Sequence, residues 1–507
     1  MKPEATIRAA DRRALFLLLA ASTGCAMSLI DTNVVAVAVP AIARDLGAGA
    51  GDAQWIISAF FLTFSASLLP VGAIADRQGR RRTFLSGLAA LAVASLVCGL
   101  APTMLWLQFG RGIQGVATAF VLAPALAVIG HRFHGEAERN RAWAIWGGVM
   151  GVTMVSAPVV GGLVVEAFGW RWGFFLNIPI CIVLAGAVIA YADESRDNSR
   201  GRIDPPGILL FATSMFGLTW GLISVQAQGL GSAGTLAGFA VGVVAMCGFI
   251  VVERIQDHAM LDLGLFRNAR FIGAVWAMFA YAATAQVMAS LLPIFLQNGG
   301  GLSAATTGFA MLPFALAMLI FPYVGARLGP HLSSPAILAL GLATVAVGNT
   351  AAGWGAWSGV WPLLLSGMFV IGSGAGLLNG ETQKAIMMTI PRDQAGVASG
   401  VSTTARFSGI LIGFAALNAV FAFGIRIRFA SDACTSVTCP DQGELAEAFI
   451  AGDPYAALAD RSESVISSVQ QYYAMAFSTS FLAAALVAAS SAALVWWLLR
   501  RPPPERR

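Results

Sequence analysis

Ionisable side chains within apolar segments are the residues of this sequence with the clearest capacity for chemistry. Each charge placed in a bilayer costs about 2.5–3.5 kcal/mol on insertion scales, so each needs a physical reason. Asp31 lies in the first apolar segment, where Gly24, Ser28 and Val35 share its helical face. These small residues allow close helix packing with the carboxylate turned inward. We interpret Asp31 as a proton or cation site, with structural pairing to a buried arginine or hydroxyl as the alternative.

A second polar group lies within the apolar segment 104–128. Gln108, Arg111, Gln114 and Thr118 recur at helical spacing, so one side of this segment is polar. A water-filled cavity is the simplest way to satisfy such a face in lipid. Arg111 cannot release its proton, so we expect it to change the charge state or availability of a nearby carboxylate. A static ion pair that joins two helices is the alternative.

Two more charged residues belong to late apolar segments. Glu381 comes three residues before Lys384, near the end of the segment 361–385, so a salt bridge near the headgroups and a coupling site both stay open. Arg406 lies deeper in its own segment, 397–422, and is a candidate partner for Glu381. Other polar residues in predicted spans are candidates for lining a cavity: Gln286, Asn379 and Asn418.

The composition indicates that lipid surrounds the elements that carry these residues. Of the 507 residues, 57% are hydrophobic and 11% are charged, whereas soluble domains average about 25% charged. One crossing takes about 20 apolar residues. We predict fourteen transmembrane helices, near residues 14–36, 52–72, 82–101, 104–128, 142–165, 170–191, 207–224, 233–252, 270–293, 305–325, 335–353, 361–385, 397–422 and 473–499.

The distribution of basic residues predicts the orientation of these helices. Most of the 31 Lys and Arg fall in loops on one side, which the positive-inside rule assigns to the cytoplasm together with both termini. The net charge of +5 is spread in short clusters and not along one face, so nucleic acid is not an expected partner. We expect the first apolar run to be retained as a helix in the cell membrane, because Asp31 interrupts it.

Several kinds of chemistry have no residues to support them. The two lysines, Lys2 and Lys384, stand outside any phosphate-binding loop, and GxSxG, HExxH and CxxC motifs do not occur. The four histidines fall in predicted loops, so we expect no metal site, no cofactor and no enzymatic activity. Cys434 and Cys439 lie in a long predicted outer loop, about 424–471, where an oxidising environment favours a disulfide.

The predicted loop after the second helix has the sequence GAIADRQGRRR. Glycines permit a tight turn, and an aspartate among arginines at a helix end can form a charge network. An ordinary basic loop is the alternative for the arginines alone. The ordered spacing resembles the signature loop between helices two and three of the major facilitator superfamily, and the resemblance implies a latch that steadies one conformation of a carrier. Its residues are Gly72, Asp76, Arg77, Gly79, Arg80 and Arg81.

Other segments resemble the fourteen-helix drug:proton antiporter branch of that superfamily. They are LIDTNVVAVAVP in the first helix, RGIQG around Arg111, WRWGFFLNIP, LPIFLQ and AGVASGVSTTARFSG. SAPVVGG in the fifth helix is similar to the antiporter motif, although Ala157 stands where that motif has glycine. The matching residues of this motif are Pro158, Gly161 and Gly162.

The resemblance implies an all-α polytopic membrane protein with the major facilitator fold. We predict two six-helix bundles, 1–195 and 261–507, and two linker helices within 196–260. The implied function is proton-coupled efflux of amphipathic, often cationic drugs by alternating access, with Asp31, Arg111, Gln114, Glu381 and Arg406 as coupling or substrate residues. A dedicated exporter of one metabolite, lipid or antibiotic is an alternative, and a membrane sensor or enzyme that transports nothing is another. We expect small-molecule drugs, protons and membrane lipid as partners, and a functional monomer.

Overall fold

The structure is a computed structural model that describes residues 3–47, 50–132, 136–194, 204–256, 263–329, 331–389, 395–432 and 463–500. Within these ranges the regular secondary structure is helical and no strand occurs. This confirms the all-α prediction. A helix satisfies its backbone hydrogen bonds internally, which a lipid-exposed segment requires.

The first group of helices extends to residue 191. Its members are α1 (Pro3–Leu46), α2 (Ala50–Gln78), α3 (Arg80–Gly99), α4 (Met104–Arg132), α5 (Glu136–Phe168), α6 (Trp170–Phe175) and α7 (Asn177–Tyr191). Helix α1 packs against α4, α5 and α7, while α4 also packs against α2 and α3. The small-residue face of α1 is in close contact with α3, because a Cβ added to Gly24 would lie 2.8 Å from the Phe84 ring.

Two helices follow as a pair, α8 (Pro205–Gln228) and α9 (Ala233–Ile255). Asp204 caps α8 by accepting a hydrogen bond from the backbone N–H of Gly207. The backbones of α8 and α9 approach closely through glycines: a Cβ on Gly238 would lie 2.6 Å from the backbone nitrogen of Gly221. Helix α8 packs against both α2 and α16 (Ala395–Asp432), so it lies beside both groups of helices.

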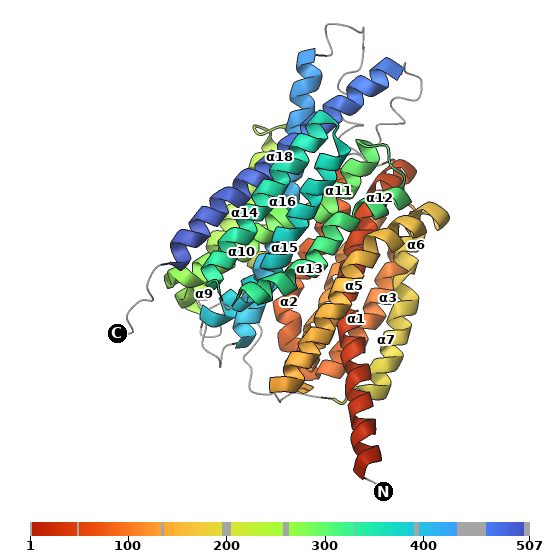
Figure 1. The fold of residues 1–507 in the computed structure, drawn as a ribbon, viewed down its shortest axis with the longest axis vertical. Helices are drawn as coiled ribbons and strands as arrows, with labels where there is room; N and C mark the ends of the chain where they lie inside the picture. The colour runs from red at the N-terminus through yellow and green to blue at the C-terminus, as the bar shows by residue number, and fades with distance from the viewer. Residues whose placement is uncertain are drawn as a thin grey trace.

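The second group begins with the short helix η1 (Leu263–Arg267). Its other members are α10 (Ala269–Tyr281), the π-helix η2 (Ala282–Gln286), α11 (Val287–Asn298), α12 (Ala304–Ala310), α13 (Leu312–Leu328), α14 (Ser334–Ser358), α15 (Trp361–Thr389), α16 and α18 (Glu463–Leu499). Helix α14 packs against α15 and α18, and α10 packs against α15, α16 and α18. In Figure 1 α1, α3, α5 and α7 lie to the right, and α10, α14, α16 and α18 lie to the left.

Twelve of the described helical segments are long and apolar enough to cross a membrane. Helices α2 and α4, of 29 residues each, lie at the two other predicted positions. The described helices are therefore compatible with the predicted fourteen. In Figure 1 the beginning of α1 lies at the bottom of the molecule, and α18 ends at its left.

The helix boundaries differ from the predicted ones in two ways. Helix α16 continues to Asp432 and α18 begins at Glu463, so both ends of the predicted outer loop 424–471 are helical. Three predicted helices are also interrupted, between α6 and α7, at η2, and between α12 and α13. Hydropathy could not reveal either difference, because a helix can extend beyond the bilayer and a local break leaves the apolar run intact.

Candidate functional site

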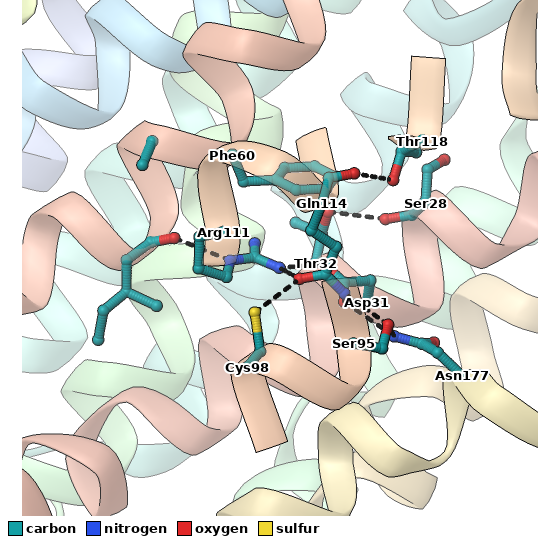
Figure 2. Close-up of polar contacts among 12 residues, drawn as sticks. Ser28, Asp31, Thr32, Phe60, Ser95, Cys98, Arg111, Gln114, Thr118 and Asn177 are labelled. Atoms are coloured by element: carbon teal, nitrogen blue, oxygen red, sulfur yellow. Dashed lines mark hydrogen bonds and ion pairs between the residues drawn. The ribbon is translucent and has the colours of Figure 1, made fainter. Parts of the chain in front are cut away.

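Asp31 and Arg111 form an ion pair inside the first group of helices. The guanidinium Nη1 donates to Asp31 Oδ2 at 2.5 Å, and the side chains are 4% and 1% exposed. Figure 2 shows the two side chains pointing toward one another, Asp31 from α1 and Arg111 from α4. The predicted pairing of Asp31 with a buried arginine is therefore what the structure shows, and Arg111 is that arginine.

Neutral amides complete the environment of the Asp31 carboxylate. Gln114 Nε2 donates to Oδ1 at 2.7 Å, and Asn177 Nδ2 donates to the same oxygen at 3.2 Å. Both amide groups also reach Ser95 Oγ on α3, at 3.2 and 3.3 Å. The carboxylate thus has partners from α4 and α7, and its amide donors share a hydroxyl on α3, as Figure 2 shows.

Arg111 has further partners that fix its orientation. Its Nε donates to the backbone oxygen of Ile56 on α2 at 2.9 Å, and Nη1 also donates to Gln114 Oε1 at 2.7 Å. The guanidinium carbon lies 4.4 Å from the centre of the Phe60 ring, a cation–π distance. Protein groups and not water therefore satisfy the polar face of α4 here, which corrects the predicted water-filled cavity. Gln108 lies apart, bonded to Asp52 at the outer end.

Asn177 and Ser95 were missed in the sequence analysis. Asn177 lies inside the WRWGFFLNIP segment and is a polar residue within an apolar run, so the cost of burying it was a usable signal. Ser95 gave none, since a lone serine in a transmembrane helix commonly bonds to its own backbone.

A second polar cluster surrounds Arg406 on α16. Its Nε donates to Gln286 Oε1 at 2.9 Å, and its Nη2 donates to Asn379 Oδ1 at 2.8 Å and to the Tyr281 hydroxyl at 3.5 Å. Gln286 and Asn379, two of the three predicted cavity residues, therefore meet here. Asn418 bonds to its own helix, at the backbone oxygen of Phe414.

Glu381 does not pair with Arg406, which corrects that expectation. Lys384 Nζ donates to both Glu381 carboxylate oxygens at 3.2 Å, in the same helix. Asn379 takes the place of Glu381 beside Arg406, because residues two apart in a helix point to different sides. The structure therefore shows the salt bridge near the end of α15, the other possibility that the sequence left open.

The predicted latch loop lies where α2 meets α3. Gly79 separates them with a φ of 115°, a conformation that favours glycine. The backbone N–H of Arg81 donates to Glu194 Oε1 at 3.2 Å, and the Arg81 guanidinium donates to the backbone oxygen of Ile189. Glu194, just after α7, is a partner that the sequence did not predict. Gly72 and Arg77 belong to α2, Arg80 begins α3 and is buried, and the side chain of Asp76 lies outside the described residues.

The predicted antiporter motif lies where α5 meets α1 and α12. A Cβ on Gly161 would lie 2.9 Å from the Cα of Val34 in α1, and one on Gly162 would lie 2.3 Å from the backbone oxygen of Ala304 in α12. Pro158 is inside α5, and a Cβ added to Gly308 of α12 would lie 2.5 Å from its backbone oxygen. Ala157, where the motif has glycine, is buried. The motif therefore permits backbone contact between the two groups of helices.

One face of α5 is in close contact with the second group of helices at one end and open at the other. Gly147, Gly151 and Gly162 share this face at helical spacing. A Cβ on Gly162 would meet the α12 backbone, one on Gly151 would meet the side chain of Leu319, and one on Gly147 would have no atom of the described residues within 4 Å. Near Gly162, two hydrogen bonds also join the groups: Gln297 donates to the backbone oxygen of Val37, and Glu166 accepts from the backbone N–H of Ala305. The two groups of helices are thus joined at the end of α5 that carries Gly162.

Two predictions concern other chemistry. Cys434 and Cys439 lie outside the described residues, so their disulfide stays a prediction. Across the described part of the chain, no three His, Cys, Asp or Glu side chains are grouped as metal ligands would be.

The fold and the buried ion pair define a multi-pass helical membrane protein. A sequence profile described as Major Facilitator Superfamily matches residues 21–414. The multidrug resistance protein Stp of Mycobacterium tuberculosis is 30% identical over 419 residues, 81% of this chain and 76% of that protein. The tetracenomycin C resistance and export protein of Streptomyces glaucescens is 31% identical over 415 residues, 80% of this chain and 75% of that protein.

Solved structures agree on the fold. A bacterial homologue of the human lysosomal transporter Spinster, in an inward-facing and unoccupied conformation, has a TM-score of 0.64 at 16% identity, over 99% of this chain and 98% of that one. The chain belongs to the Major Facilitator Superfamily.

Proposed function

We propose that this protein exports amphipathic small molecules across the cell membrane in exchange for protons. The relatives named for multidrug resistance and for resistance and export support efflux. The observation that carries the coupling is the enclosed Asp31–Arg111 pair, a carboxylate that can take up a proton beside an arginine that keeps its own. We also propose that both termini lie in the cytoplasm and that the protein functions as a monomer.

Protonation of Asp31 provides the coupling step. A buried ion pair is stable only while both charges are present, because loss of one leaves the other uncompensated in a low dielectric. A proton that arrives from outside therefore weakens the contact that joins α1 to α4. Arg111 keeps its bonds to Ile56 and Gln114, so the helices can shift relative to one another while the guanidinium stays solvated by protein groups.

Alternating access requires that the outer contacts separate. The contacts Gln297–Val37 and Glu166–Ala305 join the two groups of helices at the end that we place outside. These contacts must break before a substrate can be released outside. The glycines of the α5 motif let the two groups of helices approach closely when the contacts form again. The latch loop, with Arg81 bonded near Glu194, belongs to the opposite end and stabilises one of the two arrangements.

The test is uptake into proteoliposomes or inverted vesicles under an imposed pH gradient. We expect the wild-type protein to accumulate a substrate such as ethidium against its gradient, and Asp31→Asn to lose at least about 90% of this uptake, because the coupling proton has no acceptor. Asp45→Asn is the matched control, since Asp45 lies on the same helix in an exposed pair with Arg171. Full uphill uptake by Asp31→Asn would show that Asp31 is not the coupling site.

A dedicated exporter of one compound is the second candidate, and the relative named for a single antibiotic favours it. A panel of unrelated dyes and antibiotics in cells that lack other pumps separates the two, because a dedicated exporter protects against one chemical class. Absence of flux for every compound would instead support a membrane protein that transports nothing.

A further inference from the structure

Arg406 differs from Arg111 in having only neutral partners. Arg111 is neutralised by Asp31, whereas the groups bonded to Arg406 are an amide of Gln286, an amide of Asn379 and the Tyr281 hydroxyl. Among the described residues no carboxylate forms an ion pair with Arg406. Its charge, within the span Val401–Ile427 of α16, is therefore solvated by dipoles but not compensated, which is costly unless a counter-charge comes from elsewhere.

The position of Arg406 makes it accessible to such a counter-charge. Residues 403–407 are all partly exposed, although α16 packs against α2, α8 and α10. On α15, a Cβ added to Gly380, the residue after Asn379, would have no described atom within 4 Å. The surroundings of Arg406 are therefore partly open on both α15 and α16, which leaves room for an anion to approach.

The surrounding backbone holds the cluster in place. Gly409 and Gly413 of α16 lie against the turn around η2: added Cβ atoms would be 2.6 Å from the backbone oxygen of Phe279 and 2.6 Å from the Cα of Ala283. The π-helix η2 presents Gln286 to Arg406, and such π turns within α-helices are frequent at functional sites. A guanidinium fixed by two amide oxygens is preorganised to donate to the oxygens of an anionic group.

Aromatic side chains lie directly beside this charge. Phe407 packs against Phe64 with ring centres 4.3 Å apart and against Phe61 at 6.0 Å, and both partners lie on α2 in the first group of helices. The cluster thus offers a cation next to an aromatic surface at the boundary between the two groups. This combination suits a molecule with an aromatic body and one negative group.

We propose that Arg406, held by Gln286 and Asn379, binds the carboxylate, sulfonate or phenolate of an aromatic organic anion that enters from the cytoplasm. The inference rests on the proposed efflux function and specifies its substrate class. It adds aromatic anions to the cations expected from the sequence, because Asp31 is neutralised by Arg111 and enclosed within the first group of helices, whereas Arg406 is partly exposed and has only neutral partners.

A matched pair of probes tests the proposal: 8-anilinonaphthalene-1-sulfonate, and neutral N-phenyl-1-naphthylamine, which lacks only the sulfonate. Binding to the full-length protein in nanodiscs is measured by equilibrium dialysis against empty nanodiscs. We expect Arg406→Gln to weaken binding of the sulfonate by about tenfold or more, the range for a lost charged hydrogen bond, and to leave the neutral amine within about twofold. The affinity of Arg406→Lys for the sulfonate should lie between those of the wild type and Arg406→Gln, since lysine keeps the positive charge but lacks the planar guanidinium.

Arg327→Gln is the control for general electrostatics, because Arg327 is an exposed arginine near the end of α13. Thermal unfolding establishes that each variant is folded, and if Arg406→Gln is not, Arg406→Lys alone must still weaken binding of the sulfonate selectively. Equal loss of both probes, or unchanged sulfonate binding, overturns the inference. Uptake of the neutral amine without the sulfonate also overturns it while efflux stands, whereas selective sulfonate binding without flux of either probe refutes efflux and supports the site.

Discussion

At the residue scale, the buried charges of Asp31 and Arg111 stabilise each other. The carboxylate accepts from three side chains and the guanidinium bonds to a backbone oxygen as well, so neither charge lacks partners. The same completeness makes the pair sensitive, since removal of one member leaves a buried charge without its counter-ion. Protonation of Asp31 exerts that effect reversibly, and a substitution exerts it permanently.

A double-mutant cycle tests this dependence. We expect Arg111→Gln alone to lower the free energy of unfolding by about 3–5 kcal/mol, because Asp31 is left charged and buried. Asp31→Asn combined with Arg111→Gln should recover most of that loss without restoring coupled transport. Denaturant unfolding in detergent measures the stabilities. Arg171→Gln, in the exposed pair with Asp45, is the control and should cost about 0–1 kcal/mol. Additive effects of the two buried substitutions would contradict a mutual dependence.

At the scale of elements, α5 determines how closely the two groups of helices approach. Its small residues near the outer end allow the α12 backbone to come within contact distance, whereas the same face is open at Gly147. A rigid helix with tight contact at one end and space at the other is suited to rocking, because the contact forms in one arrangement and separates in the other.

Gly162→Leu should prevent closure of the outer end and abolish export. The added side chain would overlap the backbone of Ala304, and a helix backbone cannot move aside as a flexible side chain can. Labelling of Gln297→Cys from the outside should rise in this background, because the outer contact stays open. Gly186→Leu is the matched control, since a Cβ there has no described atom within 4 Å. Normal export by Gly162→Leu would show that this contact is not part of the cycle.

At the scale of the whole molecule, substrate charge sets the driving force. If one proton enters at Asp31 for each molecule exported, export of a monovalent cation moves no net charge, a neutral molecule one charge and a monoanion two. The membrane potential supplies about 2.3 kcal/mol per charge per 100 mV, and the pH difference supplies about 1.4 kcal/mol per unit in every case.

We therefore expect valinomycin with potassium, which collapses the potential, to reduce export most for 8-anilinonaphthalene-1-sulfonate, less for N-phenyl-1-naphthylamine, and not at all for ethidium. Nigericin, which removes the pH difference, should reduce all three. The fluorescence of the three probes in the same vesicles measures how strongly valinomycin inhibits the export of each, and Asp31→Asn vesicles give the background. Inhibition of ethidium export by valinomycin alone would mean that more than one proton moves per cation.

The sequence by itself determined the apolar segments and the residues that stand out in them. Charges in a bilayer are costly, so Asp31, Arg111 and Gln114 were visible within their helices without any knowledge of their partners. The order of Gly, Asp and Arg between the second and third helices was likewise readable, because loop chemistry is local.

Only the tertiary structure decided which side chains meet. Asn177 lies on α7 and Ser95 on α3, and Arg406 bonds to Gln286 and Asn379 and not to Glu381. These partners depend on how each helix is rotated about its axis, which packing of small residues sets and hydropathy does not encode. The same packing enclosed Arg111 with a counter-ion and left Arg406 partly exposed among neutral partners, because each helix face meets only the side chains that its neighbours present.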